Sequence, residues 1–578
     1  MRGNEEKTPH PSPLPAEPGR GDKTKNQNRK TKRIWSAAIL VAALALVATS
    51  TSKVDDPMKV QQFLEHHGLT QNPFSQEDAQ TDPLFQQHCS RGTFHPAWDK
   101  IYGDPGTPAT AVVFGEKGAG KTAIRLQIVE HTSEYNTQHP DARVFVIEYD
   151  DFNPFLDCFN GKVSWPGATP ERTLARWRLW DHIDCILSLA VTQLIDDILN
   201  ERTHGKTLPF EVQGERLQKL TRPQKRDLLL LAAFYDRSTD VALQTRWTSL
   251  RRKLRFSNWQ TWKELGIGAA VSLGMFGILA DFGWLASFFS SWWVWLIIVA
   301  GWLPWLIRQS TALWLAWKIN RQIRVLDRQT NTLRGTLTSL EAKDITGQPV
   351  PSRDRSDDRY ELLGKLQAIL KTAGFESITI LVDRVDEPHL INGSAERMKA
   401  FLWPMFDNKF LKHAGLGFKL LLPIEVSFFL AREDKEFYER SRLDKQNLIR
   451  SLEWTGESLY DLANDRITAS NSPPVLTASN ASSSGATSDN ANSSKPSAPA
   501  KLKAWFEDSI SEPELVSTLA RLRVPRHLFK FMHRLLVDHC HRYTDETPRW
   551  QIGRETLQST LAVYMRDLEA YDRGLGTG

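Results

Sequence analysis

The stretch that decides the fold is Gly115-Glu116-Lys117-Gly118-Ala119-Gly120-Lys121-Thr122, which has the spacing G-x-x-x-x-G-K-T of a phosphate-binding loop (P-loop). It follows the apolar run Ala111-Val112-Val113-Phe114, which is typical of a buried strand, and it precedes a segment from Ala123 that is typical of a helix. A strand, a glycine-rich loop and a helix in this order are the context that the motif requires. The stretch therefore predicts an α/β fold, with a parallel sheet flanked by helices.

The residues from Gly115 to Thr122 are the predicted nucleotide-binding residues. The glycines let backbone N–H groups turn inward around phosphate oxygens, and the helix that follows directs its positive end at them. We expect Lys121 to reach the β- and γ-phosphates and to assist catalysis, and Thr122 to offer its hydroxyl to Mg²⁺. The alternative, a glycine-rich turn that matches by chance, is disfavoured by the flanking strand and helix.

Composition narrows the class of protein. The chain has 578 residues, enough for two to four domains, and a formal net charge of +5, which does not argue for a nucleic-acid binder. The four cysteines (Cys89, Cys158, Cys185 and Cys540) are far apart in the sequence. We therefore expect reduced thiols facing the cytosol, without a disulfide framework or a zinc site.

Tryptophan is abundant, with 20 copies, several of them between Trp259 and Trp317. Between Leu265 and Ile307 there is no Lys or Arg, and Asp281 is the one acidic residue. The apolar stretch divides into an arm from Leu265 to about Ala280, or to Phe289, and an arm from about Trp292 to Ile307. Basic residues flank the pair on both sides: Arg251, Arg252, Lys253, Arg255 and Lys263 before it, and Arg308, Lys318, Arg321 and Arg324 after it.

This pattern predicts a two-helix transmembrane hairpin whose outer ends are cytoplasmic and whose turn, near 287–291, faces out. The alternative is a buried apolar hairpin in a soluble protein. Gly266, Gly268, Gly274 and Gly277 suggest close helix contacts and self-association, so a homo-oligomer is expected. Because the hairpin enters and leaves the membrane on the same side, it can interrupt the sequence of the nucleotide domain while the two halves still form one domain. We place the first half at 58–250, the hairpin with its basic flanks at 251–325, and a polar stalk (320–340) with the second half at 326–467.

Residues 1–57 combine a polar, basic tail with the apolar run Ile34–Ala48. The run is shorter than a spanning helix, and three interpretations compete: a membrane anchor, a signal-peptide core, or sequence outside the working protein. An ordinary anchor or signal would send the P-loop outside, where ATP is scarce. Translation from Met58 would remove this conflict, as would a shallow anchor that leaves both flanks cytoplasmic.

A second acidic motif follows the hairpin. The β-branched and aliphatic run Ser377–Val382 predicts a strand that closes on Asp383, as in a Walker B motif. Asp383 would hold Mg²⁺ through a water, and Asp386 or Glu387 would orient and deprotonate the attacking water. We favour Glu387 as the general base.

The pattern D-x-x-D-E after a buried strand resembles the Walker B motif of the STAND class of P-loop NTPases, which includes the NACHT proteins. A membrane hairpin between Walker A and Walker B resembles the KAP family, although Arg384 stands where KAP proteins have a second acid. The resemblance covers about Pro57 to Arg466 and part of the C-terminus. It implies an ATPase at the inner face of the membrane and, by extension, bacterial signalling or anti-phage defence.

Further polar residues follow predicted strands. Asp150 and Asp151 end the strand Arg143–Tyr149, where they could touch the nucleotide, although a solvated loop with an Asx turn before Pro154 explains them equally well. Glu425 ends the strand that begins at Phe418, and its charge argues against a γ-phosphate sensor. One of three arginines could act as an arginine finger, although a surface role for each is favoured: Arg432, Arg440 and Arg442.

The C-terminal part has two segments. Residues 468–500 are rich in Ser, Ala and Asn and predict a flexible linker. Residues 501–578 show helical spacing and predict a helical lid, in which Arg526 resembles the sensor-2 arginine of AAA+ and STAND lids. The alternative for Arg526 is a surface position on a helix that begins with Pro525.

We therefore expect a P-loop NTPase core, an inserted transmembrane hairpin and a C-terminal helical lid. The expected protein is an integral protein of the inner (cytoplasmic) membrane that binds Mg²⁺ and hydrolyses ATP as a switch or assembly platform. Two alternatives stay open: an AAA+-like motor acting on protein or DNA, and a scaffold that binds ATP without turnover. The sequence does not decide between ATP and GTP, and it identifies no protein partner.

Overall fold

The computed structural model describes residues 57–88, 90, 92–199, 214–237, 242–257, 261–281, 292–471 and 501–572. The predicted basic tail with its apolar run, the hairpin turn and nearly all of the Ser/Ala/Asn linker lie outside these residues. The chain divides into two compact units, Met1–Lys59 with His541–Pro548, and Val60–Cys540 with Arg549–Gly578. In the described part of the first unit, Pro57 and Thr544 form an antiparallel bridge. The second unit holds the sheet and every predicted site residue.

The second unit is built on a five-stranded sheet in which all strand pairs are parallel. The strand order is β2-β3-β4-β1-β5. The bounds are β1 (Ala111–Gly115), β2 (Arg143–Tyr149), β3 (Phe375–Val382), β4 (Leu416–Pro423) and β5 (Asn447–Ile449). The α/β prediction and its four strands are confirmed, and β5 was not predicted because its three residues carry too little pattern.

Both faces of the sheet are buried, which explains why its strands are almost continuously apolar. Alternate residues of β1 point to different cores: Val112 and Phe114 belong to the larger cluster, whereas Ala111 and Val113 belong to the smaller one. The smaller core contains Ile124 and Ile128 of α5 (Lys121–Gln138). The larger core contains most of α8 (Leu179–Leu199), whose predicted apolar stripe is buried.

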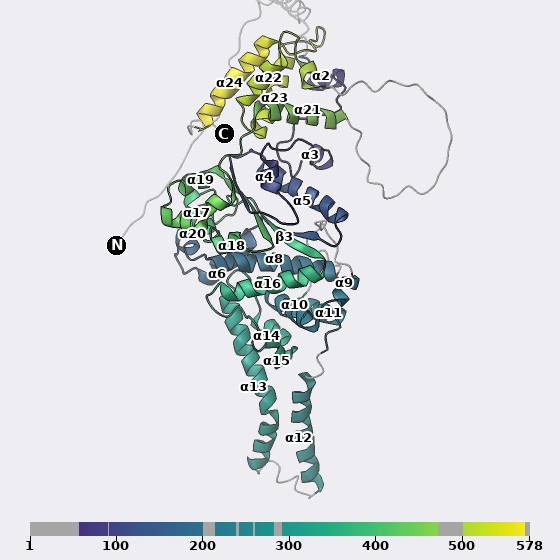
Figure 1. The fold of residues 1–578 in the computed structure, drawn as a ribbon, viewed down its shortest axis with the longest axis vertical. Coiled ribbons are helices and arrows are strands. Elements are labelled where there is room, and N and C mark those ends of the chain that lie inside the picture. The colour runs from purple at the N-terminus through teal and green to yellow at the C-terminus, as the bar shows by residue number, and fades with distance from the viewer. Residues whose placement is uncertain are drawn as a thin grey trace, which may run out of the picture. The chain divides into compact units, whose positions relative to one another are not determined.

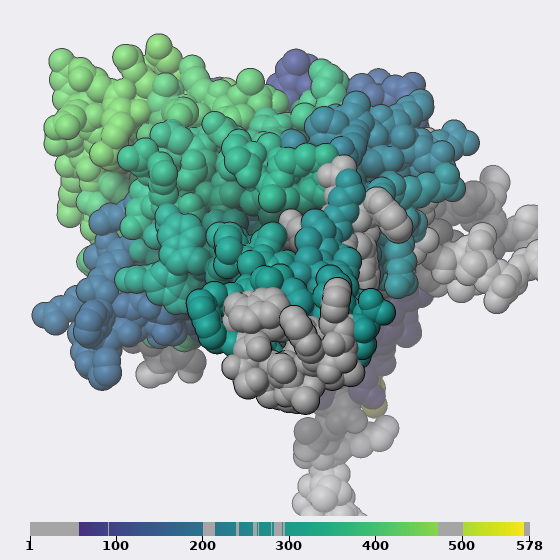
Figure 2. Space-filling model, turned by 90° about the horizontal axis from the view of Figure 1, so that it is seen from below, coloured from purple at the N-terminus to yellow at the C-terminus, as the bar shows by residue number. Residues whose placement is uncertain are grey.

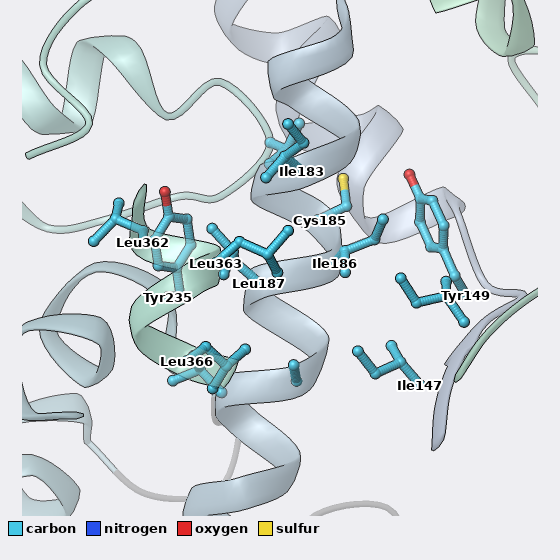
Figure 3. Packing of buried hydrophobic residues seen from close by; sticks show 14 of the residues in the cluster. Ile147, Tyr149, Ile183, Cys185, Ile186, Leu187, Tyr235, Leu362, Leu363 and Leu366 are labelled. Atoms are coloured by element: carbon cyan, nitrogen blue, oxygen red, sulfur yellow. The ribbon is translucent and has the colours of Figure 1, made fainter. Parts of the chain in front are cut away.

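Figure 3 shows this larger core, with Cys185 and Ile186 of α8 turned toward Tyr149 and Ile147 of β2. The other helices around the sheet are α4 (Trp98–Tyr102), α6 (Asn153–Val163), α7 (Pro170–Leu174), α9 (Gly214–Gln218), α10 (Arg222–Tyr235), α11 (Leu243–Lys253), α14 (Thr330–Thr338), α15 (Ala342–Ile345), α16 (Asp357–Thr372), α17 (Ala395–Leu402), α18 (Asn408–Leu411), α19 (Ile424–Leu430) and α20 (Lys435–Ser441). The N-terminal and C-terminal helices are α2 (Val60–His66), α3 (Pro83–Gln87), α21 (Gly456–Asn471), α22 (Glu512–Ala520), α23 (Pro525–His541) and α24 (Arg554–Asp572).

The predicted hairpin consists of α12 (Thr261–Asp281) and α13 (Trp292–Gln322), which lie side by side (Figure 1). A Cβ added to Gly268 would lie 2.9 Å from Trp302, and one added to Gly301 would lie 2.8 Å from Val271. These two glycines therefore allow the close approach. Gly266, Gly274 and Gly277 have no such neighbour within 4 Å.

The expectation of two spanning helices is met only in part. Among the described residues, one helix is long and apolar enough to cross a membrane, Trp295–Gln322, whereas the apolar part of α12, Leu265–Ile278, is too short for the same criterion. The second arm also continues well beyond Ile307, because α13 ends only at Gln322. The predicted polar stalk is not a separate element, since Ile323, Val325 and Leu326 after α13 are buried in the larger core.

Charged side chains hold the end of α13 to the sheet domain. Lys162 of α6 donates hydrogen bonds to the carbonyl oxygens of Asn320 (3.0 Å), Ile323 (3.0 Å) and Leu326 (2.6 Å), and so caps the helix. The Arg324 guanidinium binds both carboxylate oxygens of the fully buried Asp181 of α8. Burial raises the pKa of Asp181 to about 6, and Arg324 opposes this rise. The hairpin is therefore fixed to α6 and α8, which follow the carboxyl end of β2.

We expect Arg324→Met to lower the free energy of unfolding by about 3 kcal/mol at pH 7.5, because it leaves a carboxylate buried without its cation. The folded pKa of Asp181 lies above its unfolded value near 3.9. The raised pKa of Asp181 therefore costs stability, and this cost is full above pH about 6 and decreases as the pH falls from about 6 towards the unfolded pKa. Thermal unfolding in detergent should show a smaller defect at pH 5 than at pH 7.5.

The control is Lys409→Met, which removes the pair between Lys409 and Asp357, whose side chains are 65% and 76% exposed. Its effect should stay below about 1 kcal/mol at both pH values. An Arg324→Met protein that unfolds like the wild type at pH 7.5 would show that the buried pair is not formed.

Candidate functional site

The loop between β1 and α5 turns on two glycines with left-handed backbones. Gly118 and Gly120 both have a φ of 92°, a conformation that residues with a Cβ rarely adopt. A Cβ on Gly118 would also lie 2.4 Å from the Cβ of Arg526. Glycine is therefore required at position 118 both by the backbone and by the helix that packs on the loop.

Lys121 is the first residue of α5, and its side chain folds back over the loop. Its Nζ donates to the carbonyl oxygens of Gly115 (2.8 Å) and Glu116 (3.0 Å). Burial lowers the pKa of Lys121, and the nearby charges of Asp383, Asp386 and Glu425 oppose this shift. The ammonium group thus lies inside the concave loop, among acids from two other strand ends.

Thr122 and Asp383 meet although they lie 261 positions apart in the sequence, on either side of the hairpin. The Thr122 Oγ1 donates to Asp383 Oδ2 at 3.0 Å. Asp383 follows directly after β3 and is 1% exposed. Burial raises the pKa of Asp383, and the Arg125 guanidinium is the largest influence that opposes the rise. Parallel strands bring their carboxyl ends to one edge, which is why the two motifs come together.

Arg125 is a site residue that sequence reasoning missed. It lies one turn along α5, is completely buried, and places its Nε 3.6 Å from Asp383 Oδ2. Its Nη1 binds Glu148 (2.9 Å) and also Asp150, so it links β2 to the acid that follows β3. Only the i+3 spacing from Thr122 could have suggested this role.

The two acids that follow β2 have different partners in the structure. Asp150 pairs with Arg125. Asp151 is exposed and accepts a hydrogen bond from the Asn153 backbone N–H at 3.3 Å, which is the Asx turn of the simpler interpretation. Neither acid lines the cleft described below.

Asp386 and Glu387 both line the cleft but differ in their surroundings. Asp386 acts electrostatically on Lys121. The Glu387 side chain is 59% exposed, and its Oε1 lies 3.6 Å from Arg384 Nε. Burial raises the pKa of Glu387, whereas Arg384 lowers it. Arg384 itself has a left-handed backbone, with a φ of 59°, and donates to the Gln80 side chain. Arg384 was not predicted as a site residue.

The C-terminal helix α23 also contacts the glycine loop. The backbone N–H of Arg526, at the start of α23, donates to the Gly118 carbonyl at 3.3 Å, and its Nε lies 3.5 Å from Glu77 Oε2. The Trp454 indole donates to the Ala119 carbonyl at 2.9 Å. Arg526 therefore lies against the glycine loop, while its predicted role in nucleotide binding stays a prediction. Trp454 and Glu77 have no recognisable sequence signal.

These residues surround one cleft with a volume of about 180 Å³. Its lining includes the polar residues Lys117, Lys121, Thr122, Asp383, Arg384, Asp386, Glu387 and Arg526, together with the glycines Gly118 and Gly120. It also includes apolar residues, among them Ala79, Phe85, Ala123, Leu462 and Phe529. Such a mixed lining suits a ligand that has both charged and apolar parts.

The remaining arginine candidates lie elsewhere. Arg432, Arg440 and Arg442 are exposed, and none lines the cleft. The described residues contain no cluster of three or more His, Cys, Asp or Glu side chains that could hold a metal alone. A cation here would need Thr122, Asp383 and ligand oxygens.

Comparison with known proteins gave no match to any family model, curated protein or solved structure. The structure itself defines the class: an α/β protein with a five-stranded, all-parallel sheet flanked by helices, an architecture compatible with a P-loop-like fold.

Proposed function

We propose that this protein is a membrane-anchored, Mg²⁺-dependent P-loop ATPase that works as a nucleotide-driven switch or assembly platform. The observation that carries the proposal is the 3.0 Å contact between Thr122 of the glycine loop and Asp383 at the end of β3. A glycine-rich turn that matched the motif by chance would not be expected to contact a buried acid that follows a strand two positions away in the sheet.

The proposed Mg²⁺ site fits the donors present. A hydroxyl and a buried carboxylate are hard oxygen ligands, and Mg²⁺ usually takes one or two protein ligands together with phosphate oxygens and waters. Thr122 would bind directly and Asp383 through a water. An ion held by these two residues would supply positive charge that stabilises the charge developing on the phosphates.

The chain's own residues supply the other roles. Backbone N–H groups of the loop and the Lys121 ammonium bind phosphate oxygens. Glu387 deprotonates the attacking water. Arg384 orients the Glu387 carboxylate, because its Nε lies 3.6 Å from Glu387 Oε1. Asp386 is the alternative base. Arg526 closes the site from the lid, because its backbone is already bonded to Gly118.

The switch is supported by a path from the site to the hairpin that is made of side-chain contacts and of residues adjacent in the chain. Asp383 contacts Arg125, and Arg125 binds Asp150 at the end of β2. The neighbouring Tyr149 hydroxyl lies 3.1 Å from His182 Nδ1 on α8. Asp181, beside it, holds Arg324 after α13. A change at Asp383 can therefore bias the base of the hairpin through packed, buried groups.

The direct test is phosphate release by the detergent-purified full-length protein. We expect hydrolysis of ATP with Mg²⁺ and its loss, by at least about 100-fold, when EDTA removes the ion. Recovery on adding Mg²⁺ back excludes damage by the chelator. Nucleotide binding without phosphate release under all conditions would instead identify a scaffold.

A further inference from the structure

The second half of α13, from Arg308 to Gln322, has two different faces. Ala312, Ala316 and Ile319 are buried, and α14 packs along the helix. Arg308 ties this face to the domain by donating to the carbonyl oxygens of Thr338 (2.8 Å) and Leu340 (2.6 Å). The opposite face carries three large apolar side chains that stay exposed, namely Leu313 (41%), Trp314 (59%) and Trp317 (51%).

This exposed face matters for the length of the hairpin. The apolar stretches Leu265–Ile278 and Trp292–Ile307 rise only about 21 and 24 Å, less than the roughly 30 Å of a bilayer's hydrocarbon core. From Trp295 to Trp317 the helix rises about 35 Å. The apolar surface thus reaches membrane thickness only when Trp314 and Trp317 are included.

Two cations lie on the same face as these tryptophans. Lys318 Nζ is 4.9 Å from the ring centre of Trp314, and the Arg321 guanidinium is 5.6 Å from that of Trp317. Neither cation forms an ion pair with a carboxylate of the described residues, and α13 contains no Asp or Glu. Tryptophan and basic side chains together are typical of the headgroup layer of a membrane.

The neighbouring α6–α7 connection adds to this surface. Lys162 at the end of α6 caps α13, and the tryptophan that follows in the connection, Trp165, is 70% exposed. The blue segment containing α6 and α7 projects beside the teal hairpin helices when the molecule is seen from below (Figure 2). The exposed aromatic groups thus come from two elements that meet at the end of α13.

We propose that Trp314, Trp317, Lys318 and Arg321 form a binding surface for acidic phospholipid headgroups, which we call the lipid collar. The proposal rests on the proposed membrane anchoring and adds a lipid class to it. The tryptophan rings lie at the boundary of the hydrocarbon, and the two cations bind headgroup phosphates. The excess of positive charge, without any acid on the helix, selects anionic over zwitterionic lipid.

The test measures lipid selection by the full-length protein in detergent. Protein is incubated with mixed micelles of equal phosphatidylglycerol and phosphatidylcholine, isolated by gel filtration, and its bound lipids are quantified by mass spectrometry. We expect the wild type to retain phosphatidylglycerol preferentially. Lys318→Gln with Arg321→Gln should reduce this preference about fivefold per charge removed. Lys409→Gln with Lys435→Gln, which removes two exposed cations elsewhere, should keep the wild-type ratio.

A double glutamine variant with the wild-type lipid ratio would overturn the proposal. So would a Trp314→Ser, Trp317→Ser variant that binds lipid normally but changes from dimer to monomer in light scattering, because the face would then join two copies of the chain. Carbonate extraction and ATP hydrolysis test the proposed function separately. Release of the wild type by carbonate contradicts the membrane anchor, whereas a resistant, active protein without lipid preference contradicts the lipid collar alone.

Discussion

Lys121→Ala is expected to abolish both nucleotide-induced stabilisation and phosphate release. The Lys121 Nζ lies within 3.0 Å of two loop carbonyls, on the inner side of the loop, where phosphate oxygens would replace them as partners. Without it, the loop N–H groups would face the triphosphate charge without the ammonium group that lies inside the loop. For the wild type, a nucleotide at a hundred times its Kd should add about 2.7 kcal/mol to the free energy of unfolding. For Lys121→Ala this gain should be close to zero.

The measurement is thermal unfolding of the detergent-purified protein with and without ATP and Mg²⁺, alongside phosphate release. Lys435→Ala is a matched control, because Lys435 is 91% exposed on α20 and does not line the cleft. Without nucleotide, all three proteins should unfold at similar temperatures. A Lys121→Ala protein that is still stabilised by ATP and still releases phosphate would refute the assignment of the loop as the phosphate site.

Glu387→Gln is expected to leave nucleotide binding intact and to lower kcat by about 10²- to 10⁴-fold, the usual contribution of a general base. The amide keeps the shape of the side chain but cannot accept a proton. Because burial raises the pKa of Glu387 above its ordinary value, wild-type kcat should rise with pH through that raised pKa, where the carboxylate forms. Glu387→Gln should lose this pH dependence together with the rate.

Asp386→Asn is the comparison that decides between the two acids. Asp386 acts electrostatically on Lys121, whereas the Glu387 carboxylate lies 3.6 Å from Arg384, so the two acids differ in their charged neighbours. We expect Asp386→Asn to weaken activity less than Glu387→Gln. The reverse order, with normal binding in both variants, would assign the base to Asp386.

Local patterns explain which predictions succeeded. The strands β1 to β4 were recognisable because a strand buried on both faces is apolar at nearly every position. The glycine loop was recognisable because its backbone needs glycine at positions 118 and 120. The hairpin was recognised as a pair of apolar helices, but the end of its second helix was misplaced. Arg308 was taken as the end of the apolar helix. In the structure the helix continues past Arg308, whose guanidinium donates to the carbonyl oxygens of Thr338 and Leu340.

Partners distant in the sequence could not be predicted in the same way. Arg125 and Trp454 have ordinary neighbours in the sequence, and their roles depend on Asp383 and Ala119, which reach them through the packing of other elements. The same holds for Arg384, whose left-handed backbone has no sequence signature.

By itself, the sequence of this protein determined the α/β class, the position of the glycine loop, and the position of the acidic residues that follow β3, because each depends on the conformation of a few consecutive residues. Only the tertiary structure decided that Thr122 meets Asp383, that Arg324 is held by Asp181, and that Trp314 and Trp317 stay exposed. The physical reason is that these outcomes depend on which side chains share a buried space, and parallel strand order and helix packing bring together residues whose separation along the chain carries no signal.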